Sequence, residues 1–140
     1  MTTVLVADDS AEMRAFVRGA LGHDYPDVVE AEDGRQLFWQ LMRSSFTPSG
    51  RAAEPMVIVA DVCMPAYSGL DVLDAWHDDG PPPPVVVITS FPDDVTRARV
   101  DRLGAILLAK PFTRAKLRDA VGTCVRRVRE RAAGAGRKAP

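Results

Sequence analysis

Five short apolar segments, each followed by a helix-like pattern, narrow the possible folds of this chain more than any other feature. The segments are residues 4–7, 28–31, 56–60, 85–89 and 105–109. After the first of them, Met13, Phe16 and Val17 recur at the spacing of an amphipathic helix. Because parallel neighbouring strands need crossover connections, this alternation favours a parallel sheet with helices on both faces. We predict an α/β, doubly wound fold with five strands and five helices.

The second helical pattern carries an apolar stripe of four residues, Leu37, Phe38, Leu41 and Met42. Trp39 and Trp76 also lie on helical stripes, and we interpret both as packing residues. Residues 44–55 show no periodicity and predict a long surface loop. Gly80 and the four prolines after it mark the end of the third helix.

The last helix is predicted over residues 113–131, where one apolar face recurs. Residues 132–140 are small or basic and predict a disordered tail. A chain of 140 residues is long enough for one ordinary hydrophobic core and too short to suggest two. We therefore expect one domain over residues 1–131 and a basic tail over 132–140.

Charge is distributed unevenly along the chain. Residues 1–112 hold 9 Lys and Arg against 17 Asp and Glu, whereas residues 113–140 hold 9 against 2. An acidic body could hold a metal ion, and a basic end could contact an acidic partner or nucleic acid. The plainer interpretation of the basic end is a solvated helix face followed by a loose tail.

Several compartments and protein classes fit this sequence poorly. The start of the chain has neither a basic segment nor a cleavage site of small residues, so it does not resemble a signal peptide. The longest apolar runs fall far short of the roughly 20 residues needed to cross a bilayer. The two cysteines, Cys63 and Cys124, fit no metal spacing and make no dense disulfide framework. We expect a soluble protein in a reducing cytoplasm, without a membrane partner.

Chemically active residues stand at the ends of four predicted strands: Asp8 with Asp9, then Asp61, Thr89 and Lys110. In a doubly wound sheet the carboxyl ends of the strands form the ligand crevice, so we expect these side chains to meet there. Clustered carboxylates repel one another and call for a cation, and hard oxygen ligands suit Mg²⁺. Phosphoryl transfer, with a carboxylate as nucleophile, makes use of the whole set.

These residues, taken in order, resemble the receiver domains of response regulators, the CheY-like domains of two-component signalling. The motifs that carry the resemblance, which covers residues 3 to about 130, are Asp8-Asp9, Asp61 followed by Met64-Pro65 and Gly69, Thr89, and Lys110-Pro111-Phe112. The resemblance implies a flavodoxin-like sheet with the strand order 2-1-3-4-5.

The resemblance also implies a magnesium site. Asp9, Asp61 and the backbone carbonyl of Cys63 would hold Mg²⁺ directly, and Asp8 would act through a metal-bound water. No other cofactor is implied.

Asp61 is implied as the phosphoacceptor, and Thr89 and Lys110 as the groups that bind the phosphoryl oxygens. The donor would be a histidine kinase or a histidine phosphotransfer protein. Pro111, which in this family often follows a cis peptide bond, would fix the position of Lys110. Signalling would proceed by docking to a downstream protein, and the protein itself would be a monomer or weak homodimer, not an enzyme acting on other substrates.

The chain departs from the family at the switch position. Three residues before the lysine the family usually has Tyr or Phe, whose ring turns inward when the threonine moves, but here the residue is Leu107. The common coupling between threonine and aromatic ring therefore does not transfer to this chain directly.

Three other functions are weighed against the receiver hypothesis. An aspartyl-phosphate phosphatase would carry a second Asp two residues after the nucleophile, where this chain has Cys63. A receiver-like adaptor would keep the fold without being phosphorylated, and the missing aromatic favours it. A nucleic-acid binder would use the basic residues of the C-terminal segment, but no recognition motif accompanies them. Those residues are Arg126, Arg127, Arg129, Arg131, Arg137 and Lys138.

Overall fold

Five parallel strands form one sheet in the order β2-β1-β3-β4-β5 in the computed structural model, which describes residues 2–45, 56–77 and 84–137. The strands are β1 (Thr3–Ala7), β2 (Val28–Ala31), β3 (Met56–Asp61), β4 (Val85–Thr89) and β5 (Ile106–Ala109). This arrangement confirms the predicted doubly wound α/β fold and the strand order that the family resemblance implied.

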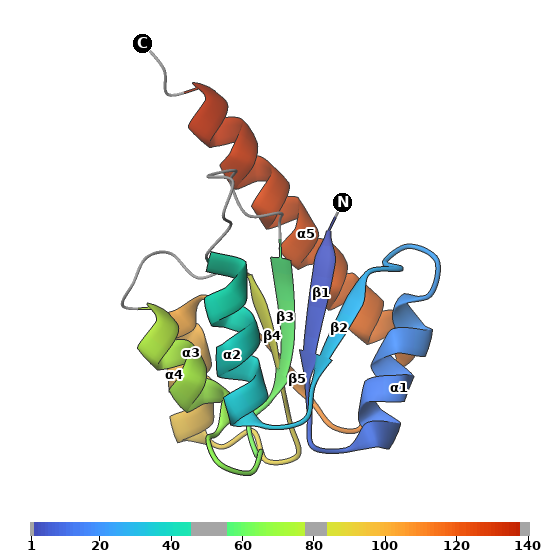
Figure 1. Ribbon diagram of the computed structural model, residues 1–140, viewed down its shortest axis with the longest axis vertical. Coiled ribbons are helices and arrows are strands. Elements are labelled where there is room, and N and C mark those ends of the chain that lie inside the picture. Colours follow the sequence, from blue (N-terminus) through green and yellow to red (C-terminus); the bar gives the residue numbers. More distant parts are fainter. Residues whose placement is uncertain (1, 46–55, 78–83, 138–140) are drawn as a thin grey trace.

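Five helices cover the two faces of the sheet (Figure 1). They are α1 (Ala11–Leu21), α2 (Gly34–Ser45), α3 (Gly69–His77), α4 (Asp94–Leu103) and α5 (Arg114–Arg137). Helices α1 and α5 pack on one face, and α2, α3 and α4 pack on the other. Each crossover carries the chain from the carboxyl end of one strand to the start of the next, so the loops that follow the strands gather at one edge of the sheet.

The two faces of the sheet take alternate residues of each strand. In β1, Val4 and Val6 pack toward α1 and α5, and Leu5 and Ala7 pack toward α2 and α3. All five residues of β4 are buried, as expected for a strand covered on both faces. Apolar side chains thus occupy the body of the sheet, and polar ones are left to its ends.

Local capping residues set the start of two helices. The Ser10 hydroxyl accepts the N–H of Met13 at 3.2 Å, and the Asp93 carboxylate accepts the N–H of Thr96 at 2.8 Å. The sequence had indicated a capped helix start at Asp93, and the structure confirms it.

Helix α5 is longer than predicted. It was expected to end at Arg131, but it continues to Arg137 and projects beyond the sheet (Figure 1). The alanines after Arg131 favour helix, whereas Gly134 and Gly136 disfavour it. The first proline after Arg131 comes only at residue 140, so no residue forces the helix to end at 131. The predicted disordered tail is therefore wrong for residues 132–137, and residues 138–140 lie outside the described residues.

Helix α2 also differs from its prediction. It continues to Ser45, so the loop predicted to begin at residue 44 begins later, and residues 46–55 lie outside the described residues. Leu37 and Leu41 are fully buried, as predicted, but Phe38 is 44% and Met42 is 38% exposed. Trp39 is 65% exposed, so its interpretation as a packing residue is wrong. One narrow stripe of α2 meets the sheet, and the rest of its apolar surface does not.

No described helix combines the length and the apolar character that a bilayer span requires. The segment 78–83, which holds Gly80 and most of the proline run, is outside the described residues.

Two glycine-to-alanine substitutions should change stability in opposite directions. A Cβ at Gly69 would overlap the backbone oxygen of Asp61, so Gly69→Ala should destabilise the domain by about 1–3 kcal/mol. Gly19 lies inside α1 with open space around it, so Gly19→Ala should stabilise the domain by about 0.5–1 kcal/mol. Urea unfolding measures both effects, and equal effects of the two substitutions would contradict the packing described at Gly69.

Candidate functional site

Three carboxylates meet at the carboxyl edge of the sheet. β1 and β3 are paired neighbours, so Asp8 and Asp9, which follow β1, lie beside Asp61, which ends β3. One oxygen of each carboxylate lies within 4.8 Å of an oxygen of the other two. Asp8 and Asp61 are 0% and 6% exposed, whereas Asp9 is exposed. The group therefore has two buried members and one open to solvent.

Lys110 brings one positive charge to the buried pair. Its ammonium nitrogen lies 3.1 Å from Asp61 Oδ2 and 3.4 Å from Asp8 Oδ2. The residue follows β5, and its backbone N–H donates to the carbonyl of Thr89 at 2.8 Å. The peptide bond between Lys110 and Pro111 is cis. The family resemblance had led us to expect that cis bond.

The charges of this cluster are unbalanced in the protein alone. Burial raises the pKa of Asp8 above its ordinary value, and the charge of Asp61 raises it further. The Ser10 N–H, which donates to Asp8 at 2.8 Å, and the Lys110 ammonium oppose this shift without cancelling it. For Lys110, burial lowers the pKa, but the hydrogen bond and charge of Asp61 together with Asp8 outweigh burial and raise it. Lys110 stays protonated, and negative charge remains in excess.

The loop after β3 is fastened to the Asp61 side chain. The backbone N–H of Cys63 donates to Asp61 Oδ1 at 3.1 Å, and the N–H of Gly69 donates to the Val62 carbonyl at 3.3 Å. Gly69 sits against the Asp61 backbone with no space for a Cβ. The glycine of the sequence motif therefore allows α3 to start close to the end of β3.

Thr89 stands at the edge of the cluster. It is 3% exposed, and its hydroxyl oxygen accepts the N–H of Phe91 at 3.1 Å. Within the described residues it forms no hydrogen bond with the three carboxylates. The structure thus brings Asp8, Asp9, Asp61 and Lys110 together, and it leaves the Thr89 hydroxyl in contact with its own loop.

Arg14 is a neighbour of the site that the sequence analysis did not identify. Its guanidinium donates to the backbone carbonyl of Asp8 at 2.7 Å and pairs with Glu30 at 3.1 Å. It therefore ties α1 to the ends of β1 and β2. The sequence signal that could have identified Arg14 is its position one turn into the helix capped by Ser10. From there a long side chain reaches back toward the end of the preceding strand.

Leu107 lies in β5, opposite Val87 of β4, and packs against the core beneath α2, α3 and α4. It is partly buried. The switch position is thus occupied by an aliphatic side chain that already forms part of the packed core.

Sequence comparison matches residues 4–122 to the response regulator receiver domain. Among curated proteins, the chain is 33% identical over 114 residues to the "Probable transcriptional regulatory protein TcrX" of Mycobacterium tuberculosis. That match covers 79% of this chain and 44% of TcrX, so the chain spans less than half the length of this relative.

Solved structures share the fold at lower identity. The signal receiver domain of a Vibrio parahaemolyticus protein of the Luxo repressor type has a TM-score of 0.81 at 23% identity, with 94% of this chain and 95% of that chain covered. The CheX-CheY-BeF₃-Mg complex of Borrelia burgdorferi has a TM-score of 0.74 at 19% identity, with 87% of each chain covered. Together with the match over residues 4–122, these observations show that the chain belongs to the receiver domains of response regulators, the signalling domains of two-component systems.

Proposed function

We propose that this domain is a phosphoacceptor, which takes a phosphoryl group onto Asp61 with the help of Mg²⁺ and signals by docking to other proteins. The observation that carries the proposal is the placement of Asp61, which is nearly buried, touches Lys110 at 3.1 Å and lies beside two further carboxylates. A carboxylate held between an ammonium and a set of oxygen ligands has what phosphoryl transfer requires, namely position and neutralised charge.

The carboxylate cluster fits a magnesium ion by the chemistry of its donors. Asp8, Asp9 and Asp61 supply hard oxygen ligands, and one ammonium cannot balance three carboxylates. Asp9 and Asp61, with the backbone carbonyl of Cys63, would hold the ion directly, and Asp8 would hold it through a bound water. When bound, the ion would reduce the negative charge that opposes approach of a phosphoryl group.

Transfer from a phosphohistidine would proceed by attack of an Asp61 oxygen on phosphorus. The O–P bond forms as the P–N bond breaks, and the electron pair leaves with the imidazole nitrogen. Lys110 would then exchange its contact with the carboxylate for one with a phosphoryl oxygen. The Thr89 hydroxyl would leave the Phe91 N–H and donate to a second phosphoryl oxygen.

The partners follow from this chemistry. The donor would be a histidine kinase or a histidine phosphotransfer protein, and a downstream protein would recognise the phosphorylated state. The Borrelia burgdorferi complex, which shares this fold, contains both BeF₃ and Mg, and this supports the proposal of an anion and a cation in the present chain. We propose residues 1–131 as the receiver domain, acting in the cytoplasm, with the rest of α5 as an extension beyond the last buried contacts of that helix.

A receiver-like adaptor without phosphorylation is the second candidate. The observation that favours it is Leu107, because an aliphatic side chain packed in the core offers no ring that could turn inward. Intact carboxylates and Lys110 oppose it, since an adaptor has no need to keep like charges buried together.

Incubation with acetyl phosphate should produce one phosphoryl adduct that depends on Mg²⁺ and is visible by intact mass. Asp61→Asn should abolish the adduct because it removes the nucleophilic oxygen. Asp24→Asn, at an exposed aspartate paired with Arg118, should leave it unchanged. Absence of an adduct both with acetyl phosphate and with a phosphorylated histidine kinase would establish the adaptor instead, and steady turnover of p-nitrophenyl phosphate would indicate a phosphatase.

Magnesium alone should stabilise the protein. Binding to the folded state adds about 1.4 kcal/mol when free Mg²⁺ is ten times its dissociation constant, which is a rise of a few degrees in Tm. Asp9→Asn should remove most of this rise, since Asp9 is the exposed carboxylate that would complete the site. KCl at matched ionic strength serves as the control, and an equal rise with KCl would exclude a specific ion site.

Asp8→Asn should stabilise the metal-free protein at pH 7. The raised pKa of Asp8 means that its ionised form costs stability. This cost grows as pH rises from the ordinary value of 3.8 toward the raised value, and it is fully present above the raised value. Below the ordinary value of 3.8 both states are protonated and the cost is gone, so the difference between variant and parent should shrink as pH falls. Thermal unfolding in EDTA from pH 7 to pH 4 measures the difference, and a variant less stable than the parent at pH 7 would contradict it.

A further inference from the structure

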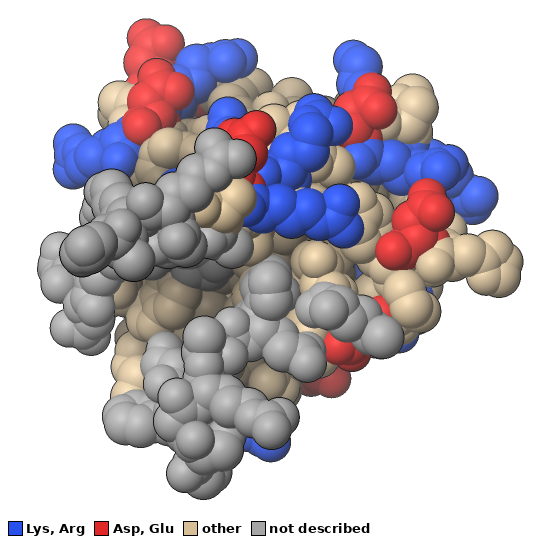
Figure 2. All heavy atoms as spheres, turned by 90° about the horizontal axis from the view of Figure 1, so that it is seen from above, with Lys and Arg blue, Asp and Glu red and all other residues tan. Residues whose placement is uncertain are grey.

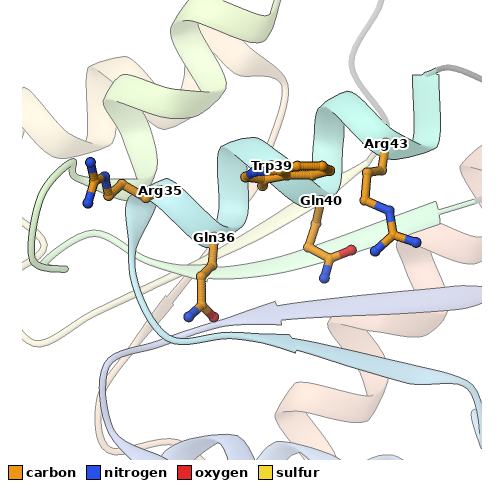
Figure 3. A pocket seen from close by; sticks show the side chains of 5 residues that line it. All are labelled: Arg35, Gln36, Trp39, Gln40 and Arg43. Atoms are coloured by element: carbon orange, nitrogen blue, oxygen red, sulfur yellow. The ribbon is translucent and has the colours of Figure 1, made fainter.

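We propose that the outward face of α2 is a docking surface for an acidic, amphipathic segment of a partner protein. We define this α2 face by the five side chains labelled in Figure 3, which line a shallow hollow of about 550 Å³: Arg35, Gln36, Trp39, Gln40 and Arg43. The proposal rests on the surface alone and does not depend on phosphorylation of Asp61.

Trp39 is the centre of this face. It is 65% exposed, whereas Leu37 and Leu41 of the same helix are fully buried and hold α2 on the sheet. Arg35, Trp39 and Arg43 follow one another at four-residue intervals, so they form a row along one side of the helix (Figure 3). The Arg43 guanidinium lies over the Trp39 ring, 6.0 Å from its centroid. Exposed tryptophan beside arginine is the composition found at the energetic centres of protein interfaces.

The charge of the helix selects the partner. Residues 34–45 contain two arginines and no acidic residue, although residues 1–112 as a whole carry 17 acidic against 9 basic residues. A basic patch of this kind attracts acidic partner segments. Lys and Arg side chains are also prominent on the face of the molecule seen from above in Figure 2, so charge alone does not distinguish the α2 face, and its exposed tryptophan does. Arginine also binds carboxylates in a bidentate manner, which fixes orientation as well as charge.

An apolar groove lies between α2 and α3, and α2 contributes to it Phe38, the residue before Trp39. It has a volume of about 240 Å³ and is lined by Phe38, Tyr67, Asp71, Val72 and Ala75. Phe38 and Tyr67, which line it, are 44% and 55% exposed. The one carboxylate among these residues, Asp71, pairs at 2.8 Å with Arg99, which also pairs with Asp74 at 2.6 Å.

The two features together define an amphipathic occupant. Carboxylates of the partner would meet Arg35 and Arg43, and a leucine- or phenylalanine-sized side chain would enter the groove between α2 and α3. A single-stranded nucleic acid would also stack on Trp39, but the apolar groove between α2 and α3 would not contribute to its binding. The observations therefore favour a protein segment.

The test is a selection of random 16-residue peptides displayed on phage against the full chain. Enriched peptides should carry an excess of Asp and Glu together with at least one large apolar residue. Synthetic copies should bind Trp39→Ala at least tenfold more weakly than the parent, as measured by isothermal titration calorimetry. The double variant Arg35→Glu, Arg43→Glu should also bind them at least tenfold more weakly, because it reverses the charge of the face.

Matched substitutions on α4 control for general effects of charge and exposed apolar surface. Arg97→Glu with Arg102→Glu reverses two charges elsewhere, and Val95→Ala trims a side chain that is 69% exposed. Both should bind the selected peptides like the parent. Because Trp39 is so exposed, Trp39→Ala should leave Tm within a few degrees of the parent. Titration of the same peptides into Phe38→Ala tests the contribution of the groove separately.

Three results would overturn the proposal. The first is the absence of enriched peptides, or enrichment of peptides without acidic residues. The second is equal binding of the selected peptides to the parent, Trp39→Ala and the charge-reversed variant. The third is a chain that does not bind peptides through Trp39 but uses this residue for another interaction. That interaction would be binding of the oligonucleotide dT16, or self-association measured by sedimentation.

Discussion

Confinement of negative charge at the carboxyl edge of the sheet is the constraint on which the site depends. Carboxylate oxygens of Asp8, Asp9 and Asp61 lie within 4.8 Å of one another, and two like charges at that distance repel by roughly 3–4 kcal/mol at an effective dielectric constant of about 20. Lys110 supplies one positive charge against these three carboxylates, and burial, together with the charge of Asp61, still raises the pKa of Asp8. The fold holds these three carboxylates close together against their mutual repulsion. Binding of a further positive charge at this site is therefore favoured.

The three carboxylates are confined to the edge of the sheet because the interior of the sheet is packed with apolar side chains. Strands β1, β3 and β4 are buried on both faces, so the first polar side chains appear where each strand ends. Parallel pairing brings those ends to one edge. Gly69 then lets α3 begin directly against Asp61, and Arg14 ties α1 to the carbonyl of Asp8. The charged cluster is held by backbone packing more than by its own contacts.

The sequence was sufficient to predict the strands and the clustered residues because both depend on local patterns. Continuous apolar runs mark the buried strands, and the polar residues that end them are brought together by parallel pairing alone. The orientation of α2 could not be predicted this way, since Leu37, Phe38, Leu41 and Met42 form one stripe whose buried width depends on its neighbours. The end of α5 was missed for a related reason, because alanines permit a helix that no packing requires. Arg14 was missed because its contacts cross from helix to strand end.

The contacts around Tyr67 connect the carboxylate cluster to α2 without using Leu107. The loop after Asp61 is bonded to that side chain through the Cys63 N–H, and farther along it the Pro65 carbonyl accepts the N–H of Gly34 at 3.3 Å. A Cβ at Gly34 would overlap Tyr67. The loop after β3 and the first turn of α2 are therefore in direct contact. A change of charge at Asp61 that displaces this loop must also displace Tyr67 and the start of α2. The tyrosine also lines the apolar groove, so the same displacement would change the shape of that groove.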